Sequence, residues 1–287
     1  MNPADRSPAQ AALPEPAPAP LPPPPSRPGR PRPRPPARAQ PTAAGLTGRD
    51  AERLLFVAEM HGVQLDLLAA IMRTSGSSAR AAVTRWQQQG LAGTARLGPG
   101  APWVWLTRSG LTACGRPYRA IPPALSRLAH LRAVTAARLA LEREPEWRAG
   151  GAWWRSERRL SARLGARGGR RDHLPDGEIH WPDDSPAGLA WAGECWAIEA
   201  ELTRKTAART TAIMRELLTR TGDYGVPAAE VLVPGFRPRH DRVLYLCSPA
   251  ARPTVQRARA ALAGPEAARV EIRLLPESAR LSPGDDQ

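Results

Sequence analysis

The sequence predicts an α/β protein, α+β overall, with a small helical domain near the N-terminus and a mixed sheet flanked by helices in its second half. Two patterns support this prediction. Apolar residues recur at helical spacing in three segments between residues 48 and 89, and a strand pair follows them. From residue 153 onward, strand-like and helix-like segments alternate, which is typical of a sheet with helices on its faces.

Composition narrows the class of partner. The chain has 287 residues and a net charge of +14, with a pI of about 11.3. Two modest domains are expected at this length, and such a positive field favours DNA over an anionic membrane as partner. Cys114, Cys195 and Cys247 lie far apart without a CxxC motif, which predicts free thiols in a reducing cytoplasm. No apolar run approaches the ~18 residues of a membrane span, so we expect a cytoplasmic protein.

Residues 1–45 are crowded with proline, and arginines lie between Arg27 and Arg38. Little in this segment can pack, so we expect a disordered tail with polyproline II character and assign it no site.

Residues 46–115 show the order of a winged helix-turn-helix domain. Thr47 is a predicted N-cap, and helices are expected at 48–61, 64–72 and 78–89. Strands are expected at 94–97 and 103–106, joined by a turn at 98–101. Three helices followed by a hairpin predict a DNA-binding domain, with a protein-contact role as the alternative.

The third helix is the predicted recognition helix. Ala79, Val83 and Trp86 form its apolar stripe, which leaves a polar face for the major groove. The residues predicted to contact DNA are Arg80, Thr84, Arg85, Gln87 and Gln88 on this helix, and Arg96 on the first wing strand.

Residues 116–150 are predicted to connect the two domains. Pro122 and Pro123 break the chain, and a helix with an apolar stripe is expected over 124–144. His130 is interpreted as a packed or surface histidine rather than a ligand. A role of this helix in a homodimer is left open.

The second domain is predicted over 151–277, with a flexible C-terminus at 278–287. Its expected elements are a short helix at 153–160 capped near Ser156, strands at 177–181 and 189–201, a helix at 204–220 capped by Thr203, a strand at 242–247, a helix at 253–263 and a strand at 270–275.

The strand after Cys195 carries the candidate chemistry. At period two, Glu199 and Glu201 lie on the face opposite Trp196 and Ile198. Asp176 follows a proline upstream, and Lys205 follows downstream. Carboxylates bind a divalent ion and a lysine polarises an attacking water, so Asp176, Glu199 and Glu201 are candidate ligands for Mg²⁺ or Mn²⁺.

These residues resemble the PD-(D/E)xK signature of restriction-endonuclease-like nucleases. Asp176 and Glu199 match its acids, but Glu201 occupies the position of its lysine. The resemblance implies that Lys205 substitutes from the following helix and that Glu157 is the accessory acid of the first helix. Candidate catalytic residues are therefore Asp176, Glu199, Glu201, Lys205 and Glu157.

The order of motifs from residue 46 to 275 resembles the replication-relaxation family. The motifs are Trp103-Val-Trp-Leu-Thr-Arg-Ser-Gly-Leu111, Trp154–Arg158, Pro175-Asp-Gly177 and Glu199-Ala-Glu-Leu-Thr-Arg-Lys205. The resemblance implies a protein of actinobacterial plasmids and integrative elements that acts in plasmid replication or conjugative mobilisation. Relaxases or replication proteins of the same element would then be its partners.

Three functions stay open. The first is a DNA-binding protein whose nuclease-like domain is degenerate, with Glu199 and Glu201 in ion pairs with Arg204, Lys205 and Arg209. The second is an active Mg²⁺-dependent nickase or endonuclease, and the third is a winged-helix transcriptional regulator. The chain lacks a His-x-His motif near a tyrosine and a Walker A loop, which argues against a common relaxase or a motor.

Overall fold

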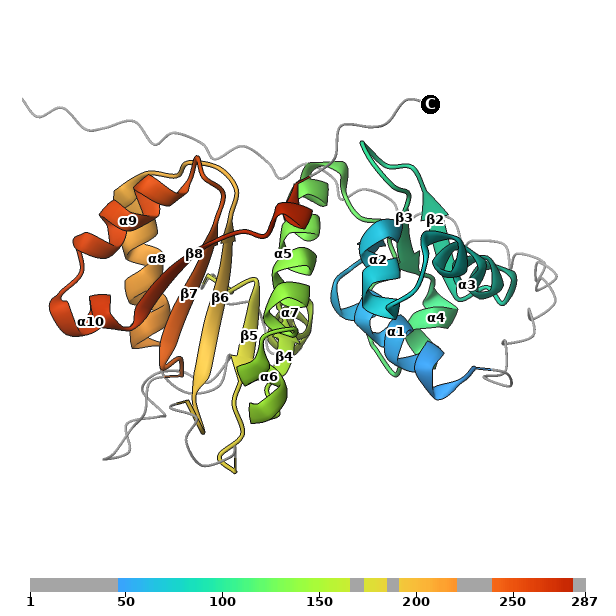
Figure 1. The fold of residues 1–287 in the computed structure, drawn as a ribbon, viewed down its shortest axis with the longest axis horizontal. Helices are drawn as coiled ribbons and strands as arrows, with labels where there is room; N and C mark the ends of the chain where they lie inside the picture. Colours follow the sequence, from blue (N-terminus) through green and yellow to red (C-terminus); the bar gives the residue numbers. More distant parts are fainter. Residues whose placement is uncertain (1–45, 166–172, 185–190, 221–238, 281–287) are drawn as a thin grey trace, which may run out of the picture. The chain divides into compact units, whose positions relative to one another are not determined.

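The computed structural model describes residues 46–165, 173–184, 191–220 and 239–280 (Figure 1). The predicted disordered tail, residues 1–45, lies outside this range. The described residues all belong to one compact unit. The predicted domain limits remain a prediction.

The first elements form a winged helix-turn-helix, as predicted. Helices α1 (Gly48–Glu59), α2 (Leu65–Met72) and α3 (Gly76–Gln88) precede the wing strands β2 (Ala92–Ala95) and β3 (Trp103–Leu106). A short strand β1 (Val63–Gln64) joins them, giving an antiparallel sheet in the order β1-β3-β2. Helix α4 (Arg108–Ala113) follows. Neither β1 nor α4 was predicted.

Side-chain caps explain where two of these helices begin. The Thr47 hydroxyl accepts from the Asp50 backbone N–H, and the Ser75 hydroxyl accepts from that of Ser78. The stripe predicted for α3 is buried: Ala79, Val83 and Trp86 all belong to the core.

The predicted connector is a central helix. After the turn η1 (Leu125–Arg127), helix α5 (Leu128–Leu141) contacts β1 and α2 of the winged helix and also strand β6 of the second sheet; α6 (Pro145–Gly150) comes next. Most apolar residues of α5 lie in the core cluster that also holds residues of the winged helix and of β6, and Leu128 and Leu131 pack with Trp103 in a smaller cluster. A role of this helix in a homodimer stays a prediction.

The second sheet has five strands in sequence order: β4 (Trp153–Ser156), β5 (Gly177–His180), β6 (Cys195–Glu201), β7 (Arg242–Cys247) and β8 (Val270–Leu274). Strands β4, β5 and β6 are antiparallel, whereas β6, β7 and β8 are parallel. Its helices are α7 (Glu157–Gly165), α8 (Ala207–Thr219), α9 (Arg252–Ala260) and α10 (Gly264–Ala268). The predicted fold class, a mixed sheet flanked by helices, is confirmed.

The two faces of the sheet belong to different core clusters. Trp196, Ile198 and Ala200 pack in the cluster that includes α5, and Ala197 packs in the cluster with α8 and α9. In Figure 1, α8 and α9 lie on one side of the sheet and α5 on the other. The predicted alternation along β6 is therefore confirmed, but Glu199 and Glu201 are buried rather than facing solvent.

Three predicted element limits were wrong. Residues 153–156 form strand β4 instead of a helix, because Trp153 to Ser156 pair with β5; the Ser156 hydroxyl caps α7 instead. The strand predicted from residue 189 begins at Cys195, after a turn over 191–193. Helix α8 is capped by Thr206, not Thr203, so Lys205 precedes the helix.

The last described element lies against α5. The turn η3 (Glu277–Ala279) contacts α5, and Ala279 is buried. The rest of the predicted flexible C-terminus, from residue 281, lies outside the described residues. Within those residues, all three cysteines are free, and no helix is long and apolar enough to cross a membrane.

Candidate functional site

Asp176 lies beside Glu199 at the start of β5. The Asp176 backbone N–H donates to Ile198 O at 2.9 Å, and its carboxylate oxygen Oδ2 accepts from the Ala200 backbone N–H at 2.8 Å. The Asp176 side chain thus binds the backbone of Ala200, the residue that follows Glu199. Two of the predicted ligands are brought together by this register.

The second oxygen of Asp176 is held by His130. His130 Nε2 lies 2.8 Å from Asp176 Oδ1, and His130 comes from α5. Burial lowers the pKa of His130, but the hydrogen bond and charge of Asp176 outweigh it, so the net shift is upward. The interpretation of His130 as a packed or surface histidine stays a prediction; its contact with Asp176 was not predicted, because the two residues meet only through the tertiary fold.

Glu199 is buried and bonded to His173. His173 Nε2 lies 2.7 Å from Glu199 Oε1, and the His173 backbone N–H donates to Glu216 of α8 at 2.8 Å. Burial, with the nearby charge of Asp176, raises the pKa of Glu199 to about 7, although His173 and Lys205 act in the opposite direction. His173 was not predicted as a site residue; its position three residues before Asp176 was the only available signal.

Glu201 forms an ion pair with Lys205. Lys205 Nζ lies 2.6 Å from Glu201 Oε2 across the end of β6. Tyr245 of β7 is the registered neighbour of Glu199, and its buried hydroxyl has no hydrogen-bond partner among the described residues. Burial, followed by the charges of Glu199 and Glu201, raises the pKa of Tyr245 well above its usual range.

Glu157 begins α7 and faces a different cation. Arg127 of η1 donates to Glu157 Oε2 at 2.7 Å, with both side chains partly exposed. The Glu157 backbone N–H donates to Asp176 O at 3.2 Å, so the predicted accessory acid does stand next to Asp176 in the chain fold.

Every predicted acid therefore has a protein partner. Asp176, Glu199 and Glu201 do not form a ready three-ligand group: within the described part of the chain, the group whose ligand atoms all lie within 4.8 Å of one another is Glu178, Cys195 and His240. Asp176 and Glu199 supply the oxygen donors that Mg²⁺ or Mn²⁺ prefers. Binding there requires His130 and His173 to give up their hydrogen bonds.

The group around Glu178 is better explained as an ion-pair network. Arg239 donates to both oxygens of fully buried Glu178 at 2.8 Å, and Arg155 lies 3.4 Å away. His180 and His240 contact the same carboxylate at 3.0 and 2.9 Å. A divalent ion added beside two guanidinium groups would leave excess buried positive charge, which is costly.

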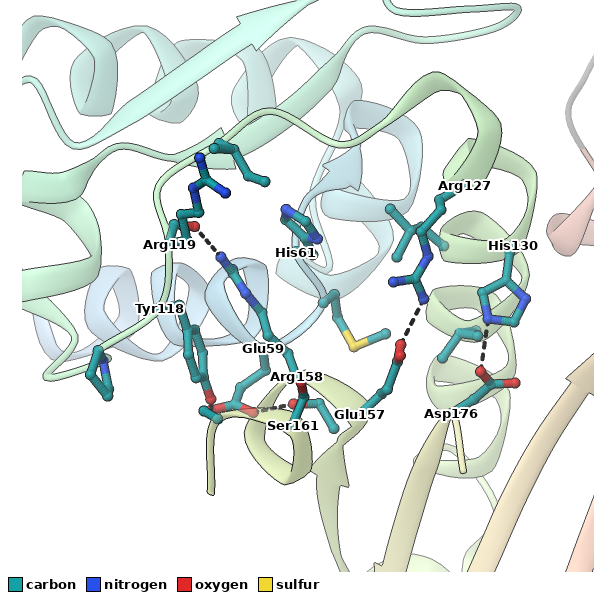
Figure 2. Close-up of a pocket in the computed structure, with 17 residues that line it drawn as sticks. Glu59, His61, Tyr118, Arg119, Arg127, His130, Glu157, Arg158, Ser161 and Asp176 are labelled. Carbon is teal, nitrogen blue, oxygen red and sulfur yellow. Dashed lines mark hydrogen bonds and ion pairs between the residues drawn. The ribbon is translucent and has the colours of Figure 1, made fainter. Parts of the chain in front are cut away.

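Asp176 also lines a pocket of about 310 Å³. It is lined by the end of α1, residues 117–121, the first turns of α5, and the β4–α7 junction (Figure 2). Glu157, His130 and Asp176 lie in its wall, together with Arg127. Glu199, Glu201 and Lys205 are not among its lining residues.

The predicted DNA-contact residues lie on the exposed side of α3. Arg80, Thr84, Arg85, Gln87 and Gln88 are all exposed. The Arg85 guanidinium comes within 4.0 Å of Asp50, and the Thr84 hydroxyl donates to Arg80 O at 3.1 Å. Arg96 is exposed but lies one residue beyond β2, in the wing loop rather than on the strand.

The segment that contains α3 has no acidic residue of its own, although Asp50 of α1 lies near Arg85. From Leu67 to Leu141 the sequence contains no aspartate or glutamate, although arginines recur through the segment. Neither Arg80 nor Arg96 forms an ion pair with any residue that the structure describes. These two guanidinium groups are free to meet an anion.

Comparison with known proteins adds little. No protein-family model and no curated protein sequence matches the chain. A solved structure of the restriction endonuclease FokI bound to DNA is similar to it, with a TM-score of 0.26 and 10% identity over 83% of this chain and 45% of that chain. The chain thus spans less than half of the FokI chain, and a likeness at this TM-score assigns no activity.

Proposed function

We propose that the protein binds duplex DNA through α3 and the wing. The observation that carries this proposal is the exposed face of α3, a helix without an acidic residue, where Arg80 stands without an ion pair among the described residues. Arginine and glutamine side chains on such a helix contact phosphates and base edges in the major groove. Arg96 in the wing adds a phosphate contact.

The test is the affinity for a short blunt duplex, measured by fluorescence anisotropy. The variant Arg80→Ala should bind about tenfold more weakly, because a charge-assisted hydrogen bond is lost. Arg143→Ala is the matched control, since Arg143 is equally exposed and lies outside the winged helix. Equal affinity of both variants would overturn the role of α3.

We propose metal-dependent cleavage of a phosphodiester as a second candidate function. The specific observation in its favour is the adjacency of Asp176 and Glu199, with Glu199 buried and its pKa raised. Asp176 and Glu199 would hold Mg²⁺ or Mn²⁺, which supplies Lewis-acid activation of the phosphoryl group. Glu201 or Glu157 would orient a water, and Lys205 would stabilise negative charge on the phosphate.

Supercoiled plasmid with Mg²⁺ or Mn²⁺ tests this second candidate. Nicking or linearisation by the wild type, lost in Asp176→Ala and Glu199→Ala, is the expected result. If no protein cuts while all of them shift the DNA, the carboxylates are paired structural groups and the second domain is a binding scaffold.

The biological setting is also part of the proposal. The order of motifs between residues 46 and 275 supports a place in plasmid replication or conjugative mobilisation, with relaxases or replication proteins of the same element as partners. A winged-helix regulator differs from this in binding a specific operator without any dependence on metal.

A further inference from the structure

The pocket beside Asp176 is lined by both polar and apolar residues. Its polar residues come from five segments and include His61, Arg119, Arg127 and Arg158 (Figure 2). Its apolar residues include Met60, Ile121, Leu131 and Val134. A volume of about 310 Å³ lies at the small end of the ~300–1,000 Å³ range of ligand pockets. A double helix does not fit such a space, but one nucleotide does.

The carboxylates of this pocket already have protein partners. Glu59 forms an ion pair with Arg116 at 2.8 Å and accepts a hydrogen bond from Tyr118 at 2.9 Å, and the Ser156 hydroxyl donates to its other oxygen. Glu157 is paired with Arg127, and Asp176 is bonded to His130. Each of them repels an incoming anion less than an unpaired carboxylate would.

Two of the three arginines that line the pocket form no ion pair with a carboxylate in the part of the chain that the structure describes. Arg119 is exposed and has no ion pair within the described residues. Arg158 donates to Ala58 O at 2.7 Å and to Arg119 O at 2.6 Å, so it satisfies carbonyls and not a carboxylate. Burial lowers the pKa of Arg158, the sign of a cation held away from water.

His61 contributes an acceptor. One ring N–H is bonded to the Ile121 backbone, and the buried Nε2 has no partner among the described residues. Burial, together with the charges of Arg158 and Arg127, lowers the pKa of His61 to about 4, so the ring is neutral at pH 7. Its Nε2 therefore carries a lone pair without a donor. In the view of Figure 2 the ring lies between Arg119 and Arg127.

We propose that this pocket receives one unpaired nucleotide of a DNA strand. Arg119 and the remaining N–H groups of Arg127 would bind its phosphate, and a base N–H would donate to His61 Nε2. The base would lie against the apolar lining residues, and burial of its apolar surface adds affinity. The inference rests on the proposed DNA binding and extends it: a strand end or an unpaired site is preferred over a continuous duplex.

The test compares a blunt duplex with the same duplex carrying a single-stranded overhang. The wild type should bind the overhang duplex about tenfold more tightly, as one ordered nucleotide contributes ~1–3 kcal/mol. Arg119→Ala should abolish this preference without changing the blunt affinity. The variant keeps the Arg119 backbone carbonyl that Arg158 contacts, so the fold is preserved. His61→Asn, which suits the positive φ of 61° at this position, should reduce the preference as well.

Controls separate the outcomes. Arg143→Ala should keep the full preference. Equal binding of the two duplexes by the wild type, or an unchanged preference in Arg119→Ala, would overturn the pocket assignment while leaving the proposed function intact. If the wild type bound neither duplex, the pocket assignment and the proposed DNA binding would both be overturned. A free deoxynucleoside monophosphate should compete only weakly; tight binding of it without any overhang preference would show that the pocket takes a free nucleotide and not a strand.

Discussion

Glu178 is a fully buried carboxylate held by arginine and histidine side chains from three parts of the chain. Arg155 lies on β4, His180 on β5, and Arg239 and His240 precede β7. Burial alone would raise the pKa of Glu178, but hydrogen bonds from His180 and His240 and the charge of Arg239 hold it well below the usual range. The network therefore connects β5, the strand that follows Asp176, to β4 and to the residues that precede β7.

Replacement by Glu178→Gln should destabilise the protein by about 3–5 kcal/mol near pH 7, because two buried guanidinium groups lose their counter-charge. Because the pKa of Glu178 is lower in the folded protein than in the unfolded chain, ionised Glu178 stabilises the fold at any pH above the unfolded pKa of 4.5. This stabilisation is lost as the pH falls through the pKa of the folded protein. The gap between wild type and variant should thus narrow below pH 4.5 in denaturant titrations. Glu271→Gln, in an exposed pair with Arg273, is the control and should cost at most ~1 kcal/mol; an equal loss in both variants would contradict the network.

Single residues were predictable only where a local pattern marked them. The spacing along β6 identified Glu199 and Glu201, and the proline before Asp176 marked the third acid. The partners of these acids were not predictable: His130 is 46 positions from Asp176, and His173 is 26 from Glu199. Nothing local to a histidine reports which carboxylate will lie next to it after folding.

Helix α3 carries both the proposed DNA contacts and part of the core. Trp86 is 1% exposed and packs in the cluster that also contains residues of α5 and β6. The exposed side of α3, which is proposed to contact DNA, is therefore supported by tertiary packing on its opposite side.

The substitution Trp86→Ala should cost about 3–5 kcal/mol, the usual loss for a large aromatic in a core. Trp86 and residues of β6 belong to the same core cluster, so both halves of the fold should unfold together. Thermal unfolding of the variant should therefore remain a single transition at a lower Tm, without a second transition for the second sheet. Circular dichroism and tryptophan fluorescence should report the same midpoint. Trp153→Ala, at an exposed position on β4, is the control; a wild-type Tm for Trp86→Ala would show that this residue is not a core residue.

Elements with strong periodicity were predicted best. Helices α1 to α3 and strands β3, β6, β7 and β8 all appear near their expected places. The segment at 153–156 was misjudged because four residues with charged neighbours fit a helix as readily as an edge strand, and only pairing with β5 decides between them. The start of α8 moved to Thr206 because several threonines nearby are equally good caps.

At the scale of the whole molecule, the winged helix is bonded to helices α5 and α7. Arg132 of α5 donates to Gln64 and Asp66 of the winged helix and to Arg280 O near the C-terminus. Arg158 of α7 grips the end of α1. Sequence patterns indicated two domains and a connector, but a shared core between them depends on contacts that no local pattern encodes.

This arrangement gives Glu157 a defined place. Its chain neighbours, Ser156 and Arg158, both contact the C-terminal turn of α1, while Glu157 itself faces Arg127. The residues that set the pocket and the acids beside it are thus held by both halves of the fold. DNA held on α3 and a nucleotide held beside Asp176 would therefore act on one rigid frame.

The most direct test of the central claim is the salt dependence of duplex binding. The logarithm of the wild-type association constant should fall linearly with the logarithm of the salt concentration, with a slope of about −0.9 for each phosphate neutralised. Arg80→Ala or Arg96→Ala should make this slope shallower by roughly one contact, whereas Arg143→Ala should leave it unchanged. A flat salt dependence in the wild type would contradict the account, because a protein that binds DNA through free arginines must release counterions.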